Sequence, residues 1–237
     1  MVNLYLIGTN HFDLRGPIRL EKFLNMVRPD TLGIEMRSQQ YESSLYSHEM
    51  VLHNSFANTM KNIALYGCEK GLLLEQLAEI SGYEVWKTTE YKIREQGVRL
   101  VCCDEMGDEL RQKIEGEWSV AHNAFLSMIQ DYDINFSSDN NNSCLLDVVG
   151  QFIQQNYDMI DNVPLSEQFS EEKFKMILTN RDAVAERRIR DLLLTTNHTF
   201  VYIGGAAHLF GNYRNLYERL SDLHPVRLKL NEVDMYR

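Results

Sequence analysis

The sequence predicts an α/β fold, with a central, mostly parallel sheet and a large helical insertion. Two observations support this prediction. Short apolar runs typical of buried strands occur near both ends of the chain and near residue 100, and long polar stretches with helical periodicity separate them. Strands that alternate with helices form right-handed crossovers within one sheet, and such strands run parallel. We expect a single domain over residues 1–237, because no linker-like stretch divides the chain.

The first strand-helix-strand unit is the clearest part of the pattern. A buried strand is expected over residues 3–8, a helix from Pro17 to about Val27, and a second strand over residues 31–35. Proline suits the first turn of a helix, because its missing N–H would have no partner there. The apolar side chains that share one face of this helix are Leu20, Phe23, Leu24 and Val27.

The remaining elements continue the alternation. The other core strands are expected at residues 98–103, 199–204 and 226–230. A helical cap is expected over about residues 38–96 and 108–197, and a further helix over about residues 209–220. Glycines divide the first part of this cap into about three helices.

The composition is that of an ordinary globular protein. Hydrophobic residues make up 44% of the chain and charged residues 24%. A membrane helix is not expected, because the sequence has no run of about 18 apolar residues. The formal net charge of -10 argues against binding to nucleic acid phosphates or to anionic lipid.

The chain start and the cysteines both favour a cytoplasmic protein. The first residues, Met1-Val2-Asn3-Leu4, have neither a basic region nor a long apolar region, so a signal peptide is not expected. The four cysteines show no C-x-x-C spacing, which is typical of a reducing compartment. We expect no nucleic acid and no membrane partner, and a homodimer is compatible with the sequence.

A G-x-x-H motif follows two of the predicted strands. Gly8-Thr9-Asn10-His11 closes the first apolar run, and Gly205-Ala206-Ala207-His208 closes the last long one. Because the carboxyl ends of parallel strands share one edge of a sheet, we expect His11 and His208 to meet in one site. The simpler interpretation of a single such histidine is a hydrogen-bonded turn residue, and the recurrence of the motif favours a site.

Two acidic residues follow other predicted strands. Glu35 ends the second strand and Asp104 follows the third. Imidazole and carboxylate groups together suit Zn, Mn, Co or Fe, which make a bound water nucleophilic. Carboxylates also commonly begin loops and cap helices, so these two residues are weaker candidates when taken alone. Sequence motifs of serine hydrolases, P-loop proteins, dinucleotide-binding proteins and H-E-x-x-H metalloproteases are absent.

Several segments together resemble the TraB/PrgY, GumN and Tiki superfamily. The segments that carry the resemblance are Ile7-Gly8-Thr9-Asn10-His11, Gly33-Ile34-Glu35-Met36 and Tyr202-Ile203-Gly204-Gly205-Ala206-Ala207-His208-Leu209-Phe210-Gly211, supported by residues 95–104 and by Arg181-Asp182-Ala183-Val184-Ala185-Glu186. The resemblance implies a fold shared with erythromycin-esterase-like and haem-uptake ChaN-like proteins. The Tiki branch is described as a Mn- or Co-dependent metalloprotease.

The resemblance also implies an active site. Matched position by position, His11, Glu35 and His208 would be the catalytic groups and the metal ligands, with Asp104 as a weaker fourth ligand. The expected cofactor is a divalent metal, with Mn or Co ahead of Zn or Fe. This sequence departs from the family where Gln40-Tyr41 replaces the usual arginine and aromatic residue.

Three residues are expected to bind the substrate. Arg37 lies two residues after Glu35 and would orient it or hold a substrate carboxylate, although an exposed arginine in water is an equal alternative. Arg181 and Tyr41 complete the expected set, and the alternative for Arg181 is a solvated helix face.

The leading function expected from the sequence is a metal-dependent hydrolase of peptide or amide bonds. Two alternatives stay open. One is a metal-independent, esterase-like hydrolase with His11 as the general base. The other is a protein that binds a peptide or small ligand without turnover.

Overall fold

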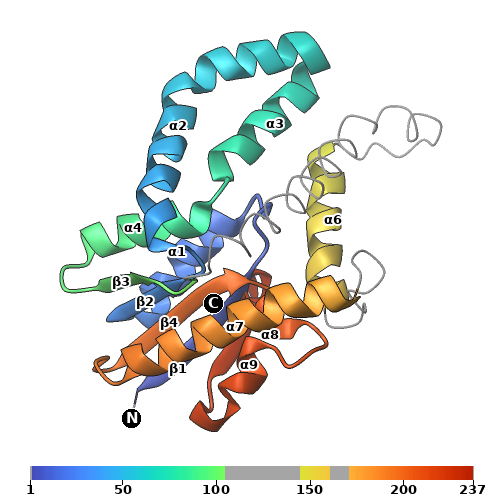
Figure 1. Cartoon of the computed structure of the whole chain (residues 1–237). Coiled ribbons are helices and arrows are strands. Elements are labelled where there is room, and N and C mark those ends of the chain that lie inside the picture. The colour runs from blue at the N-terminus through green and yellow to red at the C-terminus, as the bar shows by residue number, and fades with distance from the viewer. Residues whose placement is uncertain (1, 105–144, 161–170, 237) are drawn as a thin grey trace.

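The computed structural model describes residues 2–104, 145–160 and 171–236, with the backbone alone for residues 171–177. These residues form a mixed α/β fold around a five-stranded sheet (Figure 1). The parts of the predicted helical cap at residues 108–144 and 161–170 lie outside the described residues.

All strand pairs of the sheet are parallel, as the alternating pattern predicts. The strands are β1 (Asn3–Thr9), β2 (Thr31–Ile34), β3 (Arg99–Cys102), β4 (Thr199–Gly205) and β5 (Val226–Lys229). Their order across the sheet is β3-β2-β4-β1-β5. The predicted strands are confirmed to within one or two residues at their ends.

The register of the central strands aligns the segments that carry the two motifs. β1 and β4 are neighbours, and Gly8 lies opposite Gly204. On the other side of β4, Ile34 lies opposite Ile203, and the Glu35 N–H donates to the Ile203 carbonyl at 2.9 Å. The ends of β1, β2 and β4 therefore lie side by side at one edge of the sheet.

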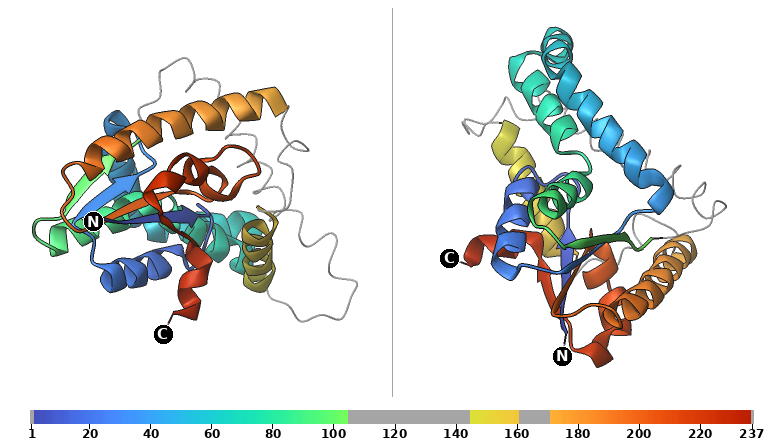
Figure 2. Two further views of the ribbon diagram at one scale, coloured as in Figure 1. Left: turned by 90° about the horizontal axis from the view of Figure 1, so that it is seen from below. Right: turned by 90° about the vertical axis from the view of Figure 1, so that its left-hand side faces the viewer.

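Helices cover both faces of the sheet. They are α1 (Gly16–Val27), α2 (Ser38–Tyr66), α3 (Cys68–Ile80), α4 (Tyr83–Arg94), α6 (Leu145–Met159), α7 (Glu171–Leu193), α8 (Ala207–Phe210) and α9 (Leu216–Arg219), with 3-10 helices η2 (Ser221–Leu223) and η3 (Leu230–Met235). Figure 2 shows α1 on one side of the strands and α7 on the other. The predicted helix from Pro17 to about Val27 is confirmed, with proline in its first turn.

The alternation of side chains along the strands divides the core into two apolar clusters. On one face, Val201 and Ile203 of β4 belong to the same buried cluster as Phe23 of α1. On the other face, Phe200 and Tyr202 cluster with buried apolar residues of α7. β4 is buried over its first six residues, which explains its continuous apolar run.

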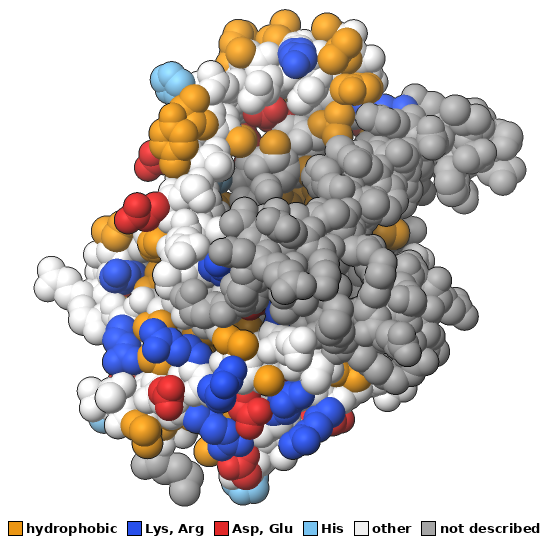
Figure 3. All heavy atoms as spheres, viewed as in Figure 1, with side chains coloured by type: hydrophobic (Ala, Val, Ile, Leu, Met, Phe, Trp, Pro, Cys, Tyr) orange, Lys and Arg blue, Asp and Glu red, His pale blue; other side chains and the backbone are white. Residues whose placement is uncertain are grey.

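Helices α2 and α3 form a hairpin, the α2–α3 arm, that projects from the sheet (Figures 1 and 2). The 29 residues of α2 include none that is buried. Hydrophobic side chains lie on the surface of the arm (Figure 3). The large ones that are exposed are Tyr46, Met50, Leu52, Phe56, Met60, Leu65, Tyr66 and Leu72.

The single helix expected over residues 209–220 is wrong. The structure has two short helices there, α8 and α9, and residues 211–215 separate them. The Asn215 side chain accepts the Glu218 N–H at 3.0 Å and so begins α9 as its N-cap. Among the described residues, no helix is both long enough and apolar enough to cross a membrane.

Candidate functional site

The side chains predicted to form a site gather at the carboxyl edge of the sheet. His11 lies two residues after β1, Glu35 directly follows β2, and His208 is the second residue of α8, just beyond β4. Gly205, the last residue of β4, lies between them. A Cβ atom built on Gly205 would lie 3.4 Å from Glu35 Oε2, 3.7 Å from His11 Nε2 and 3.7 Å from His208 Cδ2. We call the position beside Gly205 that these three groups border the Gly205 chamber.

His208 is buried and is held at both ring nitrogens. Its Nδ1 lies 2.5 Å from Asp182 Oδ1, and its Nε2 lies 3.1 Å from Glu35 Oε1. The Tyr213 hydroxyl donates to the other oxygen of Asp182 at 2.7 Å. Burial opposes a charge on the ring, but Glu35 and Asp182 outweigh it and raise the pKa of His208 to about 9. His208 is therefore an imidazolium at neutral pH.

Both carboxylate oxygens of Glu35 are paired with neighbouring groups. Its Oε1 pairs with Arg181 Nη2 and with His208, and its Oε2 accepts the Gly205 N–H at 2.5 Å. Burial alone would raise the pKa of Glu35, but His208 and Arg181 outweigh it and hold this pKa well below its usual range. Glu35 stays a carboxylate over the physiological pH range.

Arg181 lies between two carboxylates. Besides pairing with Glu35, its Nε and Nη2 both donate to Asp104 Oδ2, at 2.9 and 2.5 Å. The other oxygen of Asp104 is buried and makes no hydrogen bond with the described residues. Burial and the nearby Glu35 raise the pKa of Asp104, although Arg181 opposes the shift. Arg181 was expected to bind substrate, and in this structure its guanidinium neutralises the site's own acids.

His11 differs from His208 in its exposure. Its side chain is 36% exposed, against 6% for His208. The His11 Nδ1 lies 2.8 Å from Glu84 Oε1, so its Nε2 is the nitrogen nearer the Gly205 chamber. Burial opposes a charge on His11, but Glu84 and Glu35 outweigh it and raise its pKa. Burial would likewise raise the pKa of Glu84, but His11 outweighs it and lowers this pKa.

The loop that carries His11 is anchored on both sides. The Asn10 N–H donates to the Tyr157 hydroxyl at 2.9 Å, and the Asn10 carbonyl accepts from the Tyr83 hydroxyl at 3.3 Å. Asp13, which ends the loop, forms an ion pair with Arg19 at 2.7 Å. These contacts come from α1, α4 and α6, and they fix the loop before any ligand binds.

The donor set suits a divalent metal only in part. Both imidazoles hold a carboxylate at Nδ1, which is the usual arrangement behind a metal-binding histidine. However, both Glu35 oxygens are already bound, and the Arg181 cation lies beside Glu35 and Asp104. In the described parts of the chain, no three His, Cys, Asp or Glu side chains are grouped so that they could hold a metal ion.

The other two expected substrate-binding residues make their described hydrogen bonds elsewhere. Arg37 is buried, and its Nη2 donates to Gln39 at 3.2 Å. The Tyr41 hydroxyl shares a hydrogen bond of 2.6 Å with Thr89 on α4. Neither of these hydrogen bonds involves His11, Glu35 or His208.

Sequence reasoning missed Glu84 and Asp182, which pair with the two histidines, and Tyr213, which donates to Asp182. Asp182 had a signal, because it directly follows Arg181 within the segment that resembles the family. Glu84 had none, because 73 residues separate it from His11 and no motif surrounds it.

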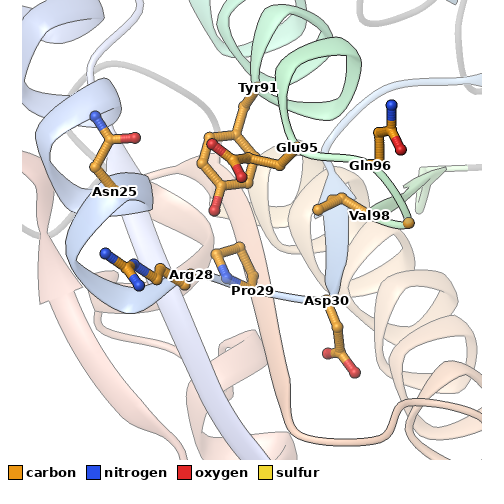
Figure 4. A pocket seen from close by; sticks show the side chains of 9 residues that line it. Asn25, Arg28, Pro29, Asp30, Tyr91, Glu95, Gln96 and Val98 are labelled. Atoms are coloured by element: carbon orange, nitrogen blue, oxygen red, sulfur yellow. The ribbon is translucent and has the colours of Figure 1, made fainter.

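A cavity of about 610 Å³ lies at the opposite edge of the sheet (Figure 4). It is lined by the end of α1, the end of α4 and the segments that lead into β2 and β3, with Arg28, Tyr91 and Glu95 among its side chains. Asp30, also in its lining, accepts three backbone N–H groups from residues 197–199. This cavity is separate from the histidines and is not the candidate site.

Comparison with known proteins adds no relative: no family model, no curated protein and no solved structure matches this chain.

Proposed function

We propose that this chain is a hydrolase in which His11 is the general base and His208 stays a cation. The observation that carries this proposal is the contrast between the two imidazoles. One is partly exposed, and the other is buried between two acids with its pKa raised to about 9. Different environments that give two titratable groups different pKa values are typical of acid–base sites.

The reaction that follows is addition of water to a carbonyl group. His11 Nε2 takes a proton from the attacking water, whose oxygen bonds to the carbonyl carbon, and the carbonyl oxygen becomes an oxyanion. The positive charge of the His208 ring, which borders the Gly205 chamber, stabilises this developing charge. When the bond to the leaving group breaks, the protonated His11 gives its proton to that group, which restores the neutral imidazole.

The substrate class rests on the family resemblance. Peptide or amide bonds are the proposed targets, with ester bonds as the esterase-like alternative. The described side chains around the Gly205 chamber do not select among these classes, because Arg181 is already paired with Glu35 and Asp104.

A metal-dependent hydrolase is the second candidate. The observation that favours it is the carboxylate at Nδ1 of each histidine, which leaves both Nε2 atoms on the chamber side. The ligands would be His11, Glu35 and His208, with Asp104 as a weaker fourth ligand. Mn or Co is the proposed metal, ahead of Zn or Fe. Arg181 would then have to release Glu35.

One experiment separates the proposals. The chain is stripped of metal with EDTA and assayed against peptide and nitrophenyl ester libraries, before and after addition of Mn²⁺ or Co²⁺. We expect activity that survives the chelator and falls at least about 10²-fold in His11→Ala, because general base catalysis contributes that much. His53→Ala, an exposed histidine on α2, is the matched control and should behave as the wild type.

The other outcomes decide against the metal-independent hydrolase. Activity that appears only with added metal supports the second candidate. Saturable binding of a peptide without any product, equal in the wild type and in His11→Ala, supports a protein that binds without turnover.

A further inference from the structure

The long helical segment between β2 and β3 reaches the candidate site at the start of α4. After the α2–α3 arm, the chain returns to the sheet as α4, and the second residue of α4 is Glu84. This side chain is 10% exposed, and its Oε1 lies 2.8 Å from His11 Nδ1. A buried carboxylate therefore approaches the imidazole from the side opposite the Gly205 chamber.

We propose that Glu84 is a positioning residue that holds His11 with its Nδ1 protonated and its Nε2 lone pair facing the Gly205 chamber. The inference rests on the proposed function, since a general base needs that lone pair. A carboxylate accepts hydrogen bonds and donates none, so Glu84 favours the tautomer with the proton on Nδ1.

The start of α4 is fixed in place by its own contacts. Tyr83, fully buried, donates from its hydroxyl to the Asn10 carbonyl in the loop that carries His11. A Cβ atom built on Gly16 would lie 2.6 Å from Tyr83 Cε1, so the tyrosine ring occupies space that only glycine leaves free. Gly82, with φ of 66°, lets the chain turn into α4 at this point.

Contacts with α2 hold the rest of α4. The rings of His48 and Trp86 stack with centroids 4.5 Å apart, and Tyr41 bonds to Thr89 at 2.6 Å. The arm is therefore connected through α4 to the orientation of His11. The helical segment between β2 and β3 completes the site as well as covering the sheet.

Each histidine of the site then has its own carboxylate, supplied from a different part of the chain. Asp182 of α7 holds the Nδ1 of His208, and Glu84 of α4 holds the Nδ1 of His11. Glu35 pairs with His208 at Nε2, the second ring nitrogen. Of the two imidazoles, only the His11 ring is partly exposed.

The test is Glu84→Gln, which keeps the size of the side chain and removes its charge. The Glu84 carboxylate also accepts its own backbone N–H. A glutamine would keep its carbonyl oxygen on that N–H and turn its amide N–H toward Nδ1, which favours the tautomer with the proton on Nε2. We expect nitrogen NMR of labelled histidine, at a pH where the ring is neutral, to show His11 moving its proton from Nδ1 to Nε2. We also expect kcat to fall by about 10²–10⁴-fold, with little change in KM.

Glu90→Gln is the matched control, because Glu90 lies on the same helix and pairs with Lys87 on its exposed side. It should keep the wild-type tautomer of His11 and the wild-type kcat. A Glu84→Gln protein that keeps the wild-type tautomer, or whose kcat stays within about threefold, overturns the proposal. The NMR measurement needs no substrate, so it decides the role of Glu84 even where the proposed hydrolase activity fails.

Discussion

At the scale of single residues, Gly205 offers a test of whether activity depends on the open position between the candidate site residues. Its missing side chain leaves room between Glu35, His11 and His208, and the distances of 3.4 to 3.7 Å are ordinary van der Waals contacts. Gly205→Ala should therefore fold normally, with a melting temperature equal to or above that of the wild type. The added methyl group occupies the chamber, so kcat/KM should fall at least about tenfold in the hydrolysis assay.

Gly204→Ala is the contrasting variant. Its Cβ atom would lie 2.8 Å from Tyr202 Cε1 and 2.9 Å from Glu35 Oε2, so these groups would have to shift. We expect thermal unfolding to show a loss of stability in Gly204→Ala only. Equal melting temperatures for the two variants would contradict this account of the chamber.

The pKa values of the two histidines predict a bell-shaped pH profile for hydrolysis. As the proposed general base, His11 would act only when it is deprotonated, and its raised pKa moves the acid limb above the usual histidine range. His208 helps only while it is protonated, so activity should fall as the pH rises through about 9. Asp182→Asn removes one charge that raises the pKa of His208, so kcat/KM measured against pH should show its alkaline limb at lower pH.

The same raised pKa makes a prediction about stability. His208 binds its proton more tightly in the folded chain than at the ordinary value of 6.5. The stabilisation is fully present below 6.5 and is lost as the pH rises through about 9. Urea unfolding at pH 6 and at pH 10 should show a smaller loss of unfolding free energy in His208→Gln than in the wild type. An identical loss in both proteins would assign the effect to other groups.

At the scale of secondary structure elements, the docking of α4 on α1 depends on one glycine. Gly16→Ala places a methyl group against the Tyr83 ring, and overpacking of this kind costs about 1–3 kcal/mol. Gly150→Ala in α6 is the matched control, because nothing lies within 4 Å of its Cβ position. Alanine inside a helix should stabilise that variant by about 0.5–1 kcal/mol. Opposite signs of the change in unfolding free energy, measured in urea, are the expected result.

The elements that the sequence predicts well are those with a strong local signal. Buried strands such as β1 and β4 are continuous apolar runs between polar segments, and α1 has both a proline start and an apolar face. The failure at residues 209–220 has a local cause. Asn215 is a better N-cap than an interior helix residue, so it begins a new helix at a point where the apolar spacing predicts continuation.

The candidate site likewise has a part that the sequence predicts and a part that it does not. Parallel topology predicts that His11, Glu35, Asp104 and His208 share one sheet edge, because each follows a strand. The partners of these groups depend on contacts between distant segments, and periodicity carries no information about them. Glu84 reaches His11 only after a long helical detour, and Arg181 turns toward Glu35 and Asp104 from a helix whose charges suggest a solvated face.

At the scale of the whole molecule, polar and apolar surface are distributed unevenly. Phe56 is 81% exposed on the α2–α3 arm, and this arm also carries other exposed apolar side chains. Substitutions there should leave the fold unaffected, because these side chains pack against little. We expect Phe56→Ser to change the unfolding free energy by less than about 0.5 kcal/mol in urea titration. A larger loss would mean that the arm is covered in solution.

The pairing of β1 with β4 has a consequence for how the protein is made. Gly8 and its neighbour Gly204 are far apart in the sequence, so His11 is synthesised long before His208. A growing polypeptide on the ribosome therefore holds an incomplete set of the candidate site residues until β4 and α8 have emerged. We expect a chain truncated before β4 to lack both His208 and the strand that pairs with β1, and therefore to lack the proposed hydrolase activity.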